Sequence, residues 1–177
     1  LDGARLFNLP LHSGHGVREY AALFDTVYVS LWKHFNAGTG AILAGDADFI
    51  EGLFHVRRMF GGAMPHAWPQ VALAGGYADT YEAEYAKSWA AAERMIRRLE
   101  SDGRYSVRRV AHGTSRFYLR APENAPGDLV ERLRTHGIML PGGPPGAREF
   151  AMQVNPTILR REPAEIAGLL IGALAGS

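Results

Sequence analysis

The sequence has no cysteine, very few lysines and no long apolar run, and each shortage excludes a class of protein. Without cysteine, disulfide frameworks, thiolate metal sites and cysteine nucleophiles are excluded, and we expect a reducing, cytoplasmic location. The apolar stretch over 166–175 is far too short to span a bilayer. A net charge of +1, from 19 basic and 18 acidic residues, leaves no strongly charged face. We therefore expect neither a membrane nor a nucleic acid as partner.

The length of 177 residues allows one substantial core, or a small domain with part of another. Apolar runs and glycine-rich breaks divide the chain into three zones, over 1–76, 77–101 and 102–177. The patterns predict buried strands over 25–32 and 40–44, a helix over 46–60, a long helix over 77–101, strands over 105–111, 116–120 and 149–154, a helix over 128–136 closed by Gly137, a Gly-Pro loop over 141–146 and a last helix from 163. The expected class is α/β.

The long helix carries an apolar stripe at three- and four-residue spacing. We interpret this stripe as core packing, or as the seam of a domain junction, rather than as a ligand cage. Its members are Tyr81, Tyr85, Trp89, Ala92 and Ile96.

Lysine is scarce, and one of the two lysines has an unusual place. Lys33 follows the apolar run 27–32 and precedes a second apolar run over 40–45, whereas the other basic residues except Lys87 are arginines. Arginine stays protonated, but a desolvated lysine can lose its proton and become a nucleophile. Lys33 is therefore a candidate for Schiff-base chemistry.

The first residues add a carboxylate to this candidate site. If the chain starts as the end of a strand, Asp2 and Ala4 project to the same face, although an Asp-Gly pair is also typical of a turn. A carboxylate can keep a ring nitrogen protonated, and alanine leaves room for a flat ring. With Lys33, this is the pair of groups that pyridoxal 5'-phosphate needs.

Four motifs carry a resemblance to a known family. They are Asp-Gly-Ala-Arg-Leu-Phe-Asn at 2–8, Val-Ser-Leu-Trp-Lys at 29–33, Gly-Ala-Ile-Leu-Ala-Gly at 40–45 and Arg-Arg-Met-Phe-Gly-Gly-Ala-Met at 57–64. In order and spacing they resemble the threonine aldolase and β-eliminating lyase family, pyridoxal-phosphate enzymes of the aspartate-aminotransferase fold. The rest of the chain resembles that family's small C-terminal domain more loosely.

The resemblance implies a role for each matching residue. Lys33 is similar to the Schiff-base lysine, Asp2 to the partner of the pyridine nitrogen, and Ala4 to the residue against the ring face. Arg5 and Arg148 resemble the two arginines that bind the substrate carboxylate, for which a bidentate grip is well suited. The implied fold is the end of a mostly parallel cofactor-binding domain over 1–76, a connecting helix over 77–101 and a small α/β domain over 102–177.

The implied activity is a lyase reaction on a β-hydroxy amino acid such as threonine, which gives glycine and an aldehyde. β-Elimination and racemisation use the same cofactor and stay open. The resemblance also implies a homodimer or homotetramer with a small amino acid as substrate. The family's phosphate-binding loop lies upstream of the Asp-Gly-Ala-Arg motif, so we expect the C-terminal part of a longer enzyme. A non-catalytic fragment is the alternative.

The sequence departs from the family pattern in two places. Small residues usually follow the lysine, whereas His34 and Phe35 stand here, and the Gly-Gly-x-Met turn is followed by Pro65 and His66 instead of Arg-Gln. The second change alters a phosphate contact or a subunit interface.

Other catalytic or metal sites have little support in the sequence. His12 and His15 have no third ligand at a suitable spacing, so we expect no metal site. We expect the remaining histidines outside the lysine motif to be surface or capping residues. These are His55, His66, His112 and His136.

Overall fold

The protein is described by a computed structural model that covers residues 1–111, 113–144 and 146–175. His112, and Pro145 of the expected Gly-Pro loop, lie outside the described residues. The chain divides into two compact units, Leu1–Ala83 and Glu84–Ser177, and both combine helices with strands as the α/β class predicts. The division into zones over 1–76, 77–101 and 102–177 stays a prediction. Within the described part of the chain, every helix is too short or too polar to cross a membrane.

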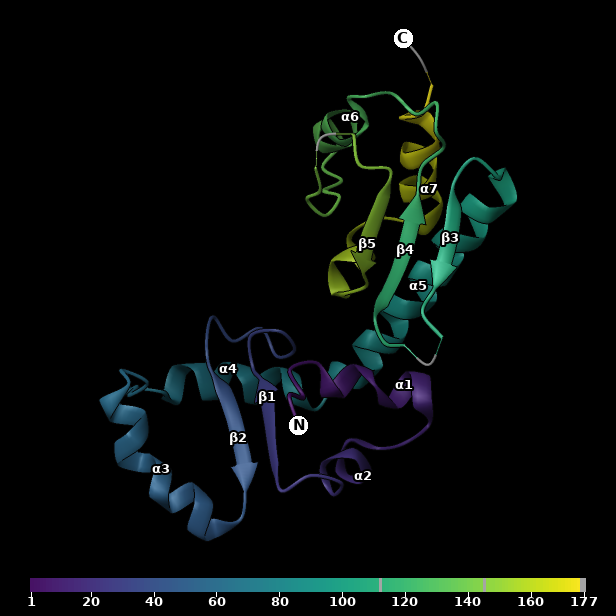
Figure 1. Cartoon of the computed structure of the whole chain (residues 1–177). Coiled ribbons are helices and arrows are strands. Elements are labelled where there is room, and N and C mark those ends of the chain that lie inside the picture. The colour runs from purple at the N-terminus through teal and green to yellow at the C-terminus, as the bar shows by residue number, and fades with distance from the viewer. Residues whose placement is uncertain (112, 145, 176–177) are drawn as a thin grey trace. The chain divides into compact units, whose positions relative to one another are not determined.

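The first unit holds most of the helices but only two strands (Figure 1). Its elements are the 3-10 helix η1 (Leu6–Asn8), α1 (Pro10–Ser13), α2 (Val17–Ala21), β1 (Thr26–Ser30), β2 (Ala41–Gly45), α3 (Ala47–Met59), α4 (Trp68–Ala78) and the start of α5 (Tyr81–Asp102). The two strands and α3 lie close to the ranges that the sequence predicts.

The strand pair of the first unit corrects one prediction. β1 and β2 pair antiparallel, with Thr26 opposite Gly45 and Ser30 opposite Ala41. The only parallel pairing in the described residues is a single bridge between Asp2 and Tyr28. The expectation of a mostly parallel sheet is therefore wrong for these strands. The reason is the connection over 31–40, which is shorter than the crossover of about a dozen or more residues that parallel neighbours need.

β2 differs from its prediction in burial. All five of its residues are exposed, although the apolar run predicts a buried strand. An apolar strand is buried only when another layer covers it. Among the described residues, β2 has β1 along one edge and no second strand along the other.

The helices of the first unit follow the sequence signals in part. α3 starts at Ala47, one residue after the predicted start, with Asp46 as its N-cap residue, and Gly61 adopts a left-handed conformation (φ 71°) just after the helix. α4 is not predicted, because Gly75 and Gly76 give its second half a low helix propensity. The long helix consequently starts at Tyr81 rather than at residue 77.

The second unit is an antiparallel sheet covered by helices. Its strands β3 (Ser106–Arg109), β4 (Arg116–Arg120) and β5 (Glu149–Gln153) lie in that order, and α6 (Leu129–Thr135), the 3-10 helix η2 (Pro156–Arg160) and α7 (Pro163–Gly172) complete the unit with the rest of α5 (Figure 1). β4 and α6 match their predicted ranges, and Gly137 closes α6 with a left-handed conformation (φ 73°). η2 is not predicted.

One face of this sheet builds the core. Phe117 and Leu119 of β4 are almost fully buried, whereas their neighbours Arg116 and Arg120 are exposed, as strand alternation requires. Side chains from α5, α6, β5 and α7 pack against them. The buried or partly buried stripe of α5 includes Tyr81, Tyr85, Trp89, Ala92 and Ile96, so its interpretation as core packing is confirmed.

Candidate active site

The first two residues lie alongside β1 and bring Asp2 to the site. The N-terminal ammonium of Leu1 donates to the carbonyl of Thr26 (2.7 Å), and the N–H of Tyr28 donates to the carbonyl of Leu1 (2.9 Å). The strand-like stretch ends there, because the N–H of Ala4 turns back and donates to Oδ1 of Asp2 (3.1 Å). The two interpretations of the Asp-Gly pair, the end of a strand and a turn, are thus each partly right, because a bridge from Asp2 to β1 is followed at once by a turn.

Gly3 permits this close approach. A Cβ at this position would lie 2.9 Å from the carbonyl oxygen of Tyr28, which is closer than real Cβ contacts. Glycine is therefore required between the two residues that the sequence assigns to the cofactor ring.

A compact turn after β1 holds Lys33. The N–H of Lys33 donates to Oγ of the buried Ser30 (3.3 Å), and the N–H of Phe35 donates to the carbonyl of Leu31 (2.7 Å). The Lys33 side chain is half-buried, and its Nζ lies 5.2 Å from the centre of the Trp32 ring. The backbone is thus fixed, while the amine still reaches solvent.

Asp2, Ala4 and Lys33 line one open depression of about 550 Å³, which we call the Asp2–Lys33 depression. Its other lining residues are Leu1, Thr26, Tyr28 and Leu43. A carboxylate and an amine therefore line the same small space, together with the aromatic residue Tyr28 of β1. This arrangement can hold a flat molecule that carries a basic nitrogen and an aldehyde.

Sequence reasoning missed Thr26 and Tyr28. Both stand on β1 two residues apart, so they project to the same face of the strand. That periodicity could have identified them once Asp2 was expected beside β1.

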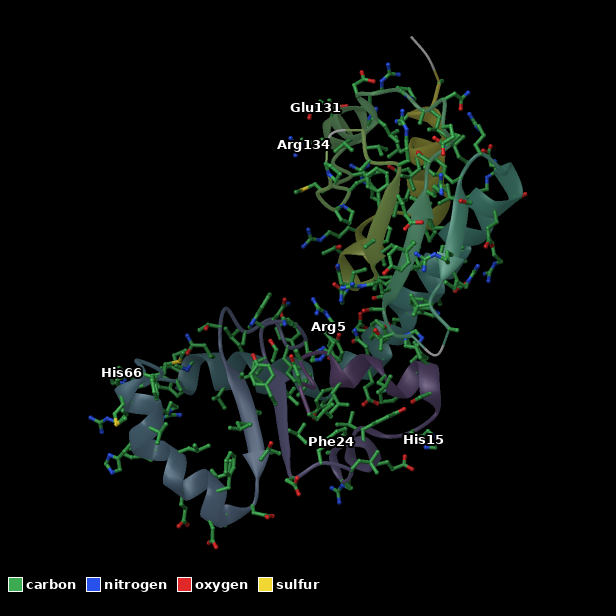
Figure 2. All side chains as sticks on the ribbon, viewed as in Figure 1. Arg5, His15, Phe24, His66, Glu131 and Arg134 are labelled. Atoms are coloured by element: carbon green, nitrogen blue, oxygen red, sulfur yellow. The ribbon has the colours of Figure 1, made fainter. Side chains whose placement is uncertain are left out.

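The two arginines of the sequence prediction have different surroundings. Arg5 is the half-buried residue ahead of η1 (Figure 2), and among the described residues it is not part of the lining of the Asp2–Lys33 depression. Its charge acts on His34 and Tyr81 instead. Arg148 belongs to the second unit, where its guanidinium donates to the carbonyl of Pro126 (3.4 Å). Their roles in carboxylate binding stay predictions.

The histidines outside the lysine turn form no cluster with acidic residues. His12 is half-buried, and burial lowers its pKa, whereas the exposed His15 lies 3.5 Å from Glu19 (Figure 2). Within residues 1–111, 113–144 and 146–175 no group of three metal-ligating side chains is found. The exposed histidines confirm their predicted surface positions. They are His55, His66 and His136.

A comparison with known families decides the relationship of the chain. The family model described as beta-eliminating lyase matches residues 1–123, which include the whole first unit and the start of the second. The chain belongs to the beta-eliminating lyase family. The match contains all four motifs and the complete lining of the Asp2–Lys33 depression.

Several relatives match different shares of the chain. A low-specificity L-threonine aldolase from Candida albicans is 38% identical over 74 residues, or 42% of this chain and 20% of that enzyme. An alanine racemase, TOXG, from Cochliobolus carbonum is 38% identical over 64 residues, or 36% of this chain and 16% of that protein. A solved structure from Listeria monocytogenes, provisionally named an L-allo-threonine aldolase, is 26% identical with a TM-score of 0.74, and the match covers 98% of this chain and 50% of that one. The chain thus spans at most about half the length of these relatives.

One departure from the family pattern has a clear structural setting. His34, directly after the lysine, is only 7% exposed, and both of its ring nitrogens are buried without a hydrogen-bond partner in the described part of the chain. Burial, together with the charges of Arg5 and Lys33, lowers the pKa of His34 to about 4. The chain therefore keeps an uncharged imidazole beside its candidate lysine at neutral pH.

Proposed function

We propose that this chain is part of a pyridoxal-phosphate-dependent lyase that cleaves the Cα–Cβ bond of a β-hydroxy amino acid. The products would be glycine and an aldehyde, as for threonine. The observation that carries the proposal is that the Asp2 carboxylate and the Lys33 amine line the same depression in a member of the beta-eliminating lyase family. The names of the threonine aldolases among its relatives support the choice of substrate class.

The residues of the depression fit the ring and the aldehyde of the cofactor. Asp2 is exposed, and only Oδ1 accepts a local backbone N–H, which leaves Oδ2 for a protonated ring nitrogen. Ala4 adds little bulk, and the Lys33 amine can reach an aldehyde carbon. Among the described lining residues there is no guanidinium for the phosphate, so the phosphate contacts must come from other residues.

Each residue has a definite task in the proposed reaction. Lys33 Nζ would hold the cofactor through its aldehyde carbon, and the lysine amine could accept or return a proton when substrate is bound. Asp2 keeps the proton on the ring nitrogen. When bound, pyridoxal phosphate supplies an electron sink for the electrons of the broken bond. Arg5 orients the substrate carboxylate, and Arg148 is the second arginine that the resemblance suggests for this task.

We also propose that the protein works as a homodimer or homotetramer. Large apolar side chains are strongly exposed around α3 and α4, including Met59 (76%), Phe60 (82%) and Trp68 (73%). Exposed apolar surface of this kind is typical of association sites.

A second reaction is supported by one observation. The alanine racemase is 38% identical over 64 residues, the same identity as that with the Candida aldolase over 74 residues. The matched segment is thus compatible with racemisation or β-elimination as well as with aldol cleavage. The choice among them depends on the residues that face the substrate.

The test is to map the cofactor attachment. The full chain is mixed with pyridoxal phosphate, reduced with borohydride and analysed by peptide mass spectrometry. We expect the adduct on Lys33, its loss in Lys33→Arg and its retention in the matched control Lys87→Arg. An adduct confined to Lys87 or the amino terminus would contradict the proposal. Threonine isomers are then assayed for glycine, for deamination and for inversion at Cα, because each reaction gives a different product.

A further inference from the structure

A buried histidine without hydrogen bonds follows the candidate lysine. Burying an imidazole nitrogen without a partner is costly, and most buried polar atoms in proteins have at least one. Neither Nδ1 nor Nε2 of His34 has a hydrogen-bond partner among the described residues, although the residue is only 7% exposed. The contacts of the ring with other side chains, and not hydrogen bonds of its nitrogens, must therefore explain why a histidine stands here.

Those contacts form an aromatic cluster of Phe7, His34, Phe35 and Tyr81. The centre of the His34 ring lies 5.7 Å from that of Phe7, 5.5 Å from that of Phe35 and 4.8 Å from that of Tyr81. The Phe7 and Tyr81 contacts are edge-to-face, a favourable arrangement for aromatic rings. Phe35 contacts the same two rings, at 5.0 Å from Phe7 and 5.4 Å from Tyr81, so His34 is one of two rings through which the lysine turn meets two other elements.

The aromatic cluster connects three segments of the first unit. Phe7 stands in η1, His34 and Phe35 in the lysine turn, and Tyr81 at the start of α5. The hydroxyl of Tyr81 donates to Oδ1 of Asn8 (2.6 Å), and this hydrogen bond links the start of α5 to η1 a second time. The segment that carries Arg5 is therefore held to the turn that carries Lys33.

Charge explains why the ring must stay neutral. The groups that face His34 are the Arg5 guanidinium from the segment before η1, the Lys33 amine from its own turn and the Tyr81 phenol from α5. Burial raises the pKa of Tyr81 to about 12, so the phenol offers no negative charge at neutral pH. A protonated imidazole would add a third cation beside Arg5 and Lys33 without a counter-ion from these groups.

We propose that His34 is a positioning residue whose uncharged ring fixes the lysine turn against the Arg5 segment, and so sets where the Lys33 amine points. This role rests on the proposed function of Lys33 and is specific to this chain, because small residues are usual at this position in the family. It predicts that the ring matters for Lys33, and that its nitrogens do not.

The test compares two variants of the full chain at neutral pH. His34→Phe keeps a flat ring and removes the nitrogens, whereas His34→Ala removes the ring. The first readout is the ratio of Lys33 to Lys87 labelling by pyridoxal phosphate and borohydride, with exposed Lys87 as reference in the same molecule. We expect a ratio within about twofold of the wild type for His34→Phe, and a fall of about tenfold for His34→Ala, which corresponds to about 1.4 kcal/mol.

The second readout does not need the cofactor. Reductive ¹³C-methylation gives one NMR signal for each of the two lysines. We expect the Lys33 signal to shift in His34→Ala and to stay in place in His34→Phe, with the Lys87 signal constant in both. Val27→Ala, a loss of buried volume outside the aromatic cluster and the depression, should leave both signals unchanged.

The outcomes separate the two proposals. Unlabelled Lys33 in the wild type overturns the cofactor proposal, while the NMR comparison still decides the role of His34. An unchanged Lys33 signal in a folded His34→Ala overturns the positioning role, whatever the labelling shows, and so does a shift of equal size in Val27→Ala. If circular dichroism shows that His34→Ala is unfolded, His34→Leu replaces it, because leucine keeps apolar volume without a ring.

Discussion

The two units bury their apolar side chains to very different degrees. The second unit has one continuous core that includes Ile96, Leu119 and Leu133, all essentially inaccessible to solvent. The first unit carries the candidate site, yet most of the exposed large apolar side chains of the molecule belong to it. The second unit therefore has a well-packed core of its own, whereas the first leaves many large apolar side chains exposed.

The largest expected effect tests this contrast directly. Phe117→Ala in the second unit, where the ring is 2% exposed, should lower the free energy of unfolding by about 3–5 kcal/mol through lost burial and a cavity. Ile42→Ala on β2, where the side chain is 52% exposed, should change it by less than about 0.5 kcal/mol. Urea unfolding followed by circular dichroism measures both, and similar losses in the two variants would break the comparison.

A smaller effect is expected from the protonation of His34 in the first unit. His34 has a folded pKa of about 4, below its unfolded value of about 6.5, so between these values the unfolded chain binds a proton that the folded chain does not. The free energy of unfolding should therefore be independent of this group above pH 7 and fall by up to about 3 kcal/mol as pH drops toward 4.

Hydrogen exchange of first-unit amides between pH 7 and 4.5, corrected for intrinsic rates, measures this loss. His34→Phe should remove most of the slope, and His12 and Glu19, whose pKa values are also lowered, contribute to the remainder. An equal slope in wild type and His34→Phe would show that the buried imidazole does not control stability.

The smallest expected effects come from a matched pair of buried tyrosine hydroxyls. Tyr81 donates to Oδ1 of Asn8 in the first unit (2.6 Å), and Tyr105 donates to the carbonyl of Leu170 in the second (2.9 Å). Tyr81→Phe and Tyr105→Phe should each cost about 1–2 kcal/mol, because each leaves a buried acceptor without that donor. The hydrogen-exchange rates of backbone amides should rise mainly in the unit that carries the substitution. An equal loss of amide protection in both units would show that the two units unfold together.

The sequence predicts local structure well where local signals decide it. α3 starts next to Asp46, β4 follows strand alternation, and Gly137 ends α6, because helix-start signals, strand periodicity and left-handed glycine act within a few residues. Burial of β2 is predicted wrongly, since an apolar run does not reveal whether another layer covers it. α4 is missed because its two glycines lower the helix propensity of its second half. Pro69 at the start of the helix, where proline is favourable, is the signal that could have indicated it.

The candidate site shows the same division. The lysine is found by its rarity and Asp2 by its motif, and the structure brings both to one depression. Tyr28 and His34 are not found as site residues, because their importance arises from contacts with residues distant in sequence: Leu1 and Asp2 beside Tyr28, and Phe7 and Tyr81 around His34.

The close approach at Gly3 has a consequence for genetic screens. Any side chain there would meet the carbonyl oxygen of Tyr28 and push the Asp2 backbone away from β1. A library scored only by enzyme turnover would rank Gly3 with Asp2 and Lys33, although glycine has no group that can react. Sorting such hits by the amount of folded protein, and then by cofactor attachment, separates residues that do chemistry from the one that lets the backbone reach its place.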